Sequence, residues 1–260
     1  MKNIHHIIGI ALSIFCVTTS SFALEEAADK GDFKLSLEKP QDNAQDELYA
    51  VLKEEDVFGE LISDLNSAIV LPRDIPVKFA SCGQANAFYD PNTHTVTMCY
   101  DLILHFLRIL GQDGKTEEQV EQSVAEATTF ILFHEVGHAL VHNLDIPITG
   151  KEEDAVDDLA ALVSLAFDDA GEQMVASAAE AFAAMASRED YQKLPFHDEH
   201  SLSAQRMYST MCILYGSNPQ KFQGLVAENL LPQARAERCP AEFQQKTKSW
   251  EKLLANFIKS

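Results

Sequence analysis

Basic residues are scarce in this chain. Lysine and arginine together number 20, against 40 aspartates and glutamates, and the net charge is −20. A protein that binds nucleic acid needs a patch of basic residues to neutralise phosphates. No stretch of the sequence supplies such a patch, so we exclude nucleic acid as a partner.

Long apolar segments are also missing. The apolar stretch near the N-terminus, residues 7–17, is too short to span a bilayer. With Lys2 before it and Ser21-Phe22-Ala23 after it, the stretch is typical of a secretory signal peptide that is cleaved before Leu24. We therefore expect residues 1–23 to be a signal peptide, no stable membrane insertion, and a periplasmic or extracellular protein.

The cysteines lack a Cys-x-x-Cys spacing, which argues against a zinc site built from thiolates. Four of the five cysteines follow the predicted signal peptide. An even number in an exported chain favours disulfides. Chain order suggests the pairs Cys82–Cys99 and Cys212–Cys239, although four cysteines allow three pairings.

Residues 24–44 are polar and acidic, and we expect a mobile segment there. Beyond it, alternating apolar residues predict strands, and apolar residues at helical spacing predict helices. The strands are expected over 75–82 and 94–99, and the helices over 46–68, 100–110, 116–143, 152–167, 172–187, 202–215 and 241–258. A small strand cluster followed by mostly helices predicts an α+β fold. We expect residues 45–260 to form a single domain.

The most informative stretch, residues 130–142, places two histidines and a glutamate in an apolar helix. His134 and His138 are four residues apart, so both imidazoles lie on one helix face and can bind one Zn²⁺. Glu135 lies beside them and can take a proton from a water. This is the His-Glu-x-x-His pattern of zinc peptidases. The alternative is that both histidines are ordinary core residues. A glutamate next to them in an apolar stretch argues against it.

Gly137, inside the motif, and His142, just after it, carry further expectations. Gly137 destabilises a helix interior by about 1 kcal/mol, which indicates close approach by another element. His142 lies eight residues after His134, about 12 Å along the axis, too far to share the metal. The longer pattern with a third histidine is excluded, because Val141 and Leu144 occupy the positions that would need glycine and histidine.

A third zinc ligand is expected from the next predicted helix. Glu153 and Asp157 share a face there, so Glu153 could bind zinc while Asp157 accepts the second ring N–H of His134. Asp154 and Asp158 offer the same spacing one residue later. Acidic residues at a helix start also suit the helix dipole, which accounts for residues 152–154 without any metal.

These motifs resemble the gluzincin metallopeptidases. Besides His-Glu-x-x-His and Glu-x-x-x-Asp, two stretches look like neprilysin: residues 86–98, which begin Asn-Ala-Phe-Tyr, and residues 198–206, with Asp-x-His and an arginine six residues after the histidine. As a whole the chain also resembles a bacterial family of short metallopeptidases. The resemblance implies a zincin-like fold, with a small antiparallel or mixed sheet on the motif helix and a mostly helical C-terminal lobe across the zinc cleft.

The resemblance also implies roles for individual residues. His134, His138 and Glu153 would bind one zinc ion, Glu135 would be the general base, and Asp157 would orient a histidine ligand. His200, held by Asp198, would stabilise the oxyanion, and Arg206 would bind a substrate carbonyl. Asn86 and the Ala87 backbone would pair with an extended peptide. His197 is an alternative to His200, and Asn86 could instead be a simple turn residue.

The sequence therefore predicts an exported zinc peptidase that acts on a peptide or protein substrate. A zincin-fold protein that binds peptides without cutting them is the alternative. The presence of Glu135 argues against it, since a binding protein has no use for that base. The sequence gives no indication of oligomeric state.

Overall fold

The computed structural model describes residues 28–111, 114–190 and 192–259. The predicted signal peptide, residues 1–23, lies outside these ranges. The strands are β1 (Phe33–Leu37), β2 (Ile75–Ala80), β3 (Ala87–Asp90) and β4 (Thr95–Cys99). The helices are η1 (Asn43–Gln45), α1 (Asp46–Glu54), α2 (Gly59–Ala68), α3 (Tyr100–Leu110), α4 (Glu117–Asn143), α5 (Glu152–Leu165), α6 (Asp168–Ala186), α7 (Ser203–Ser217), α8 (Gly224–Ala227), α9 (Gln233–Ala236) and α10 (Cys239–Leu254).

The four strands form one mixed sheet in the order β1-β2-β4-β3. β1 and β2 run parallel, as do β2 and β4, whereas β3 is antiparallel to β4 and lies at the edge. Helices η1, α1 and α2 lie between β1 and β2 in the chain, and the other helices of the described residues follow β4. The predicted α+β fold, a small mixed sheet with a mostly helical C-terminal part, is thus confirmed.

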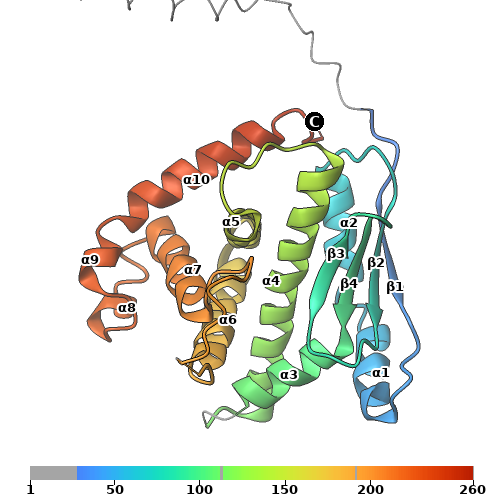
Figure 1. Cartoon of the computed structure of the whole chain (residues 1–260), viewed down its shortest axis with the longest axis horizontal. Coiled ribbons are helices and arrows are strands. Elements are labelled where there is room, and N and C mark those ends of the chain that lie inside the picture. The colour runs from blue at the N-terminus through green and yellow to red at the C-terminus, as the bar shows by residue number, and fades with distance from the viewer. Residues whose placement is uncertain (1–27, 112–113, 191, 260) are drawn as a thin grey trace, which may run out of the picture.

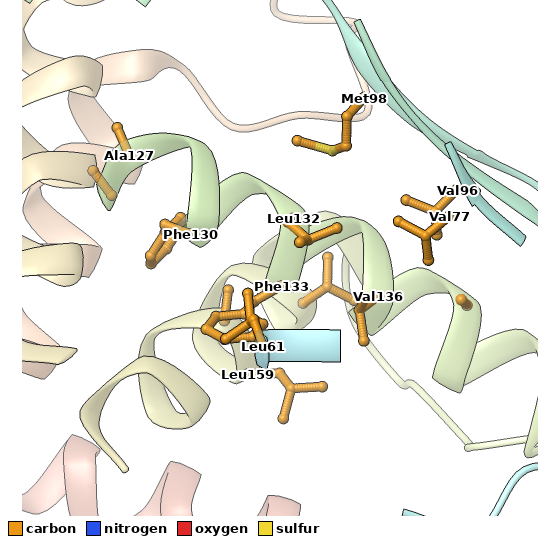
Figure 2. Packing of buried hydrophobic residues seen from close by; sticks show 14 of the residues in the cluster. Leu61, Val77, Val96, Met98, Ala127, Phe130, Leu132, Phe133, Val136 and Leu159 are labelled. Carbon is orange, nitrogen blue, oxygen red and sulfur yellow. The ribbon is translucent and has the colours of Figure 1, made fainter. Parts of the chain in front are cut away.

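Helix α4 lies between the sheet and the C-terminal helices (Figure 1). The helix starts where we expected it, because the side chain of Thr116 accepts a hydrogen bond from the backbone N–H of Gln119 and caps the first turn. On one side, Leu132 and Val136 of α4 approach Val77 and Val96 of the sheet (Figure 2). A helix that is covered on both sides must be apolar around most of its circumference. Any polar residue in its middle is therefore unusual and needs an explanation.

Two expectations about the N-terminal part are wrong. Residues 33–37 lie in the segment that we expected to be mobile, yet they form β1, in which Phe33 is fully buried and Leu35 and Leu37 pack on the core. The helix expected over 46–68 is two helices, α1 and α2. The break falls at Asp56, whose φ of 46° is left-handed and ends the first helix.

Both predicted disulfides are confirmed. Cys82–Cys99 ties the chain after β2 to the end of β4, and Cys212–Cys239 ties α7 to the start of α10. The Cα atoms of the two pairs are 5.5 and 5.1 Å apart, within the usual range. Among the described residues, no helix combines the length and apolar character needed to cross a membrane.

Candidate metal centre

The middle of α4 carries His134 and His138 one turn apart. Their Nε2 atoms are 3.2 Å apart, and the two rings meet edge to face. His134 is 2% exposed and Glu135 is 5% exposed, so both polar side chains lie in the interior. Burial of this kind is rare unless the polar groups have partners or bind a metal.

Helix α5 crosses α4 at Gly137. A Cβ on that glycine would lie 2.9 Å from Cβ of Val156, closer than real side chains approach. The predicted close approach by another element is therefore present, and the element is α5. The contact brings the first turns of α5 over the two histidines.

Glu153 faces both histidines. Its Oε2 atom lies 3.2 Å from Nε2 of His134, and its Oε1 atom lies 3.4 Å from Nε2 of His138. Oε2 is buried and has no hydrogen-bond partner among the described residues. A tetrahedral zinc ion with bonds of about 2.0–2.1 Å separates its donor atoms by about 3.3 Å. The spacing and the unpaired oxygen both fit one zinc ion.

Each of these histidines has a carboxylate at its other ring nitrogen. Nδ1 of His134 is 2.7 Å from Asp157, as the sequence predicted, and Nδ1 of His138 is 2.7 Å from Glu152. Such contacts fix the tautomer that leaves Nε2 free for a metal. The contact of Glu152 with His138 was not predicted, because the helix dipole alone explained an acidic residue at this position.

The alternative pair on α5 faces elsewhere. Asp154 accepts a hydrogen bond from Ser201, at 2.7 Å, and Asp158 pairs with Lys246 of α10. Neither carboxylate hydrogen-bonds or forms an ion pair with the histidines of α4. The geometry therefore favours Glu153 and Asp157 over the second register.

Arg206 of α7 lies deep in this region. Its Nε and Nη2 atoms each donate to Asp157 at 2.7 Å, and its guanidinium stacks 4.2 Å from the ring centre of Phe182. Asp157 is thus held between Arg206 and His134. The contact of Arg206 with a substrate carbonyl stays a prediction, but a role in holding Asp157 is visible directly.

His200, rather than His197, reaches the centre. Its Nε2 atom lies 3.0 Å from Oε2 of Glu153, and its Nδ1 atom lies 3.2 Å from Asp198. The backbone N–H of His200 also donates to Asp198. Donor atoms of His134, Glu153 and His200 all lie within 4.8 Å of one another, close enough to hold a metal ion.

The surroundings shift the acidity of these groups. Burial raises the pKa of Glu135 above its ordinary value. Burial would also raise the pKa of Asp157, but Arg206 and His134 outweigh it and hold that pKa below its usual range. Burial alone would lower the pKa of His134, yet its contacts with Asp157 and Glu153 raise that pKa to about 9. A zinc ion bound there would displace that proton.

The pKa of His200 is also raised above its ordinary value. The contact with the Glu153 carboxylate contributes most to this shift, and the contact with Asp198 adds less.

The edge strand β3 lies beside α4 (Figure 1). The carbonyl of Asn86, just before β3, accepts a hydrogen bond from the backbone of Cys99, and Ala87 is the first paired residue. The hydroxyl of Tyr89 contacts His142 at 2.7 Å. His142 is thus engaged at the end of α4, away from the metal centre. The other edge of β3 has no strand partner in the described part of the chain.

Comparisons with known proteins agree with this geometry at the level of family. The model of the family DUF4344, described as "Putative metallopeptidase", matches residues 37–254, which include every residue of the candidate centre. No curated protein and no solved structure matches the chain.

Proposed function

The chain belongs to the DUF4344 metallopeptidase family, and on that premise we propose that it is an exported, gluzincin-type zinc peptidase that hydrolyses peptide bonds in peptides or proteins. The observation that carries the proposal is that both carboxylate oxygens of Glu153 face the Nε2 atoms of His134 and His138. One of these oxygens, Oε2, is buried and has no hydrogen-bond partner among the described residues. The order of motifs along the chain, which resembles that of neprilysin, supports the same assignment.

His134, His138 and Glu153 would hold the zinc ion. When bound, zinc polarises a water molecule and the carbonyl of the scissile amide. Glu135 accepts the proton of the attacking water and passes it to the departing amine. Its burial suits this task, because a carboxylate with a raised pKa is a better proton acceptor near neutral pH.

The residues around the ligands keep them in place. Asp157 and Glu152 hold the Nδ1 protons of His134 and His138, so that each Nε2 lone pair faces the metal. Arg206 neutralises Asp157 and fixes its orientation through two hydrogen bonds.

Two further parts of the molecule would act on the substrate. His200, oriented by Asp198, would donate a hydrogen bond to the oxyanion that forms on the carbonyl. Such a donor is typically worth about 3–4 kcal/mol. The free edge of β3 at Asn86 and Ala87 would bind an extended peptide by strand addition. The two disulfides support export to an oxidising compartment.

Replacement of the base tests the function. We expect Glu135→Gln to reduce cleavage of a peptide library by more than about 1,000-fold, or about 4 kcal/mol of barrier, while the protein still binds one zinc ion. Glu121→Gln is the matched control, since Glu121 is an exposed glutamate on the same helix. Cleavage and zinc content of that variant should equal those of the unaltered protein.

Two results would contradict the proposal in different ways. Undiminished cleavage by Glu135→Gln would show that the assigned base is wrong. Zinc and peptide binding by the unaltered protein without any cleavage would instead favour the peptide-binding alternative.

A further inference from the structure

His200 shares its arrangement with the two histidines of α4. In each of the three, Nδ1 contacts a carboxylate: Asp157 for His134 and Glu152 for His138, both at 2.7 Å, and Asp198 for His200, at 3.2 Å. In each of the three, Nε2 lies within 3.4 Å of Glu153. A carboxylate on one ring nitrogen and the metal on the other is the usual arrangement of a metal-binding histidine.

The contact between His200 and Glu153 points the same way. Nε2 of His200 lies 3.0 Å from Oε2 of Glu153, whereas Nε2 of His134 lies 3.2 Å from the same oxygen. Yet Oε2 has no hydrogen-bond partner, so the two atoms are close without the alignment of a hydrogen bond. Two atoms with lone pairs at this distance need a proton or a cation between them. A zinc ion beside Oε2 would serve its contacts with His200 and with His134 at once.

The segment that carries His200 is held in a way that permits release. Phe196, four residues before His200, is 80% exposed, and the side chain of His200 is 44% exposed. The contacts of this stretch with the start of α5 are polar: Ser201 with Asp154, and Lys151 with the carbonyls of Asp198 and His200, both at 3.4 Å. Segments with few buried apolar contacts open at low free-energy cost.

We propose that His200 is a fourth protein ligand of the zinc ion in the resting protein. It occupies the coordination position that a catalytic site must leave open, and the proposal rests on the peptidase function proposed above. A substrate carbonyl would displace His200, whose freed Nε2 takes up a proton from solvent and can then donate a hydrogen bond to the oxyanion. The segment before α7 thus holds the site closed until a peptide binds along β3.

The decisive measurement is metal affinity. The zinc dissociation constant of His200→Ala, from competition with a chromogenic chelator, should be at least about 10-fold weaker, because loss of a mere partner of a ligand already weakens binding 10–100-fold. His197→Ala is the matched control, since that histidine lies on the same segment and outside the metal cluster. It should bind zinc as the unaltered protein does. His200→Gln, with the same expected loss, guards against a local folding defect.

Cobalt in place of zinc reports the ligand set directly. The visible spectrum of the cobalt protein should differ between His200→Ala and the unaltered protein. Acetohydroxamate, a small chelating inhibitor, should change the spectrum of the unaltered protein toward the one it gives with His200→Ala.

Unchanged zinc affinity and an unchanged cobalt spectrum in His200→Ala would overturn the inference and leave the peptidase function standing. Failure of that function would look different, because the unaltered protein would then bind no zinc or Glu135→Gln would still cleave.

Discussion

Helix α5 carries two pairs of carboxylates with the same spacing and different surroundings. Glu153 and Asp157 face the histidines of α4, whereas Asp154 and Asp158 face Ser201 and Lys246. The pairs are one residue apart in sequence, which is about 100° around a helix. Rotation of α5 by that angle would exchange them, so the packing of α5 decides which pair can bind a metal.

The pKa values of Asp157 and Asp158 also differ between the two pairs. Arg206 and His134 overcome burial and hold the pKa of Asp157 below its usual range. Burial dominates at Asp158 and raises its pKa to about 6, despite Lys246. Asp157 therefore stays ionised, as a partner of a metal-bound histidine must, over the whole range in which a peptidase would work. Asp158 loses its charge in mildly acidic solution.

The largest expected effect comes from replacing the carboxylate of Glu153, which faces the histidines, with an amide. The same replacement at Asp154, in the other pair, should have little effect. Glu153→Gln should abolish stoichiometric zinc binding and reduce peptide cleavage by more than about 1,000-fold, because a catalytic zinc needs all three protein ligands. Asp154→Asn is the matched change, and it should retain one zinc ion per chain. Zinc content by atomic absorption, together with cleavage rates, would measure both. Equal zinc loss in the two variants would show that the comparison between the pairs is wrong.

A smaller effect is expected from the contact that sets the rotation of α5. Gly137→Ala places a methyl group 2.9 Å from Cβ of Val156, closer than real side chains approach, so α5 must move outward. A displacement near 1 Å at the reacting groups reduces kcat/KM by about 100-fold. Adding Val156→Gly should restore much of the activity, since loss of the valine side chain makes room for the added methyl group. Full activity in Gly137→Ala alone would mean that this contact does not position Glu153.

The smallest effect is expected from replacing Asp157 or Asp158 with asparagine. Asp157→Asn should weaken zinc binding about 10–100-fold, because His134 loses the carboxylate that fixes its tautomer. Asp158→Asn should leave zinc affinity unchanged, since its partner is Lys246. Chelator competition on the two variants, side by side, would measure the difference. Weaker zinc binding in Asp158→Asn alone would reverse the assignment of the two registers.

Much of the local structure could be predicted from residue patterns. The spacing of apolar residues predicted α3 and α4 closely, and Thr116 marked the start of α4. Strand β1 was missed, because its exposed Lys34 and Ser36 hide the single buried face that Phe33, Leu35 and Leu37 provide. The helix break at Asp56 was missed because a left-handed aspartate leaves no signature in apolar spacing.

The candidate metal centre, too, could be predicted from the sequence only in part. The sequence by itself determined that His134, Glu135 and His138 share one helix, since a spacing of four fixes their positions on a turn of 3.6 residues. Only the tertiary structure decided that Glu153 faces them, that Glu152 supports His138 and that His200 reaches the same point. Those relations depend on how helices and connecting segments pack. Packing is set by contacts such as that of Gly137 with Val156, between residues far apart in the chain.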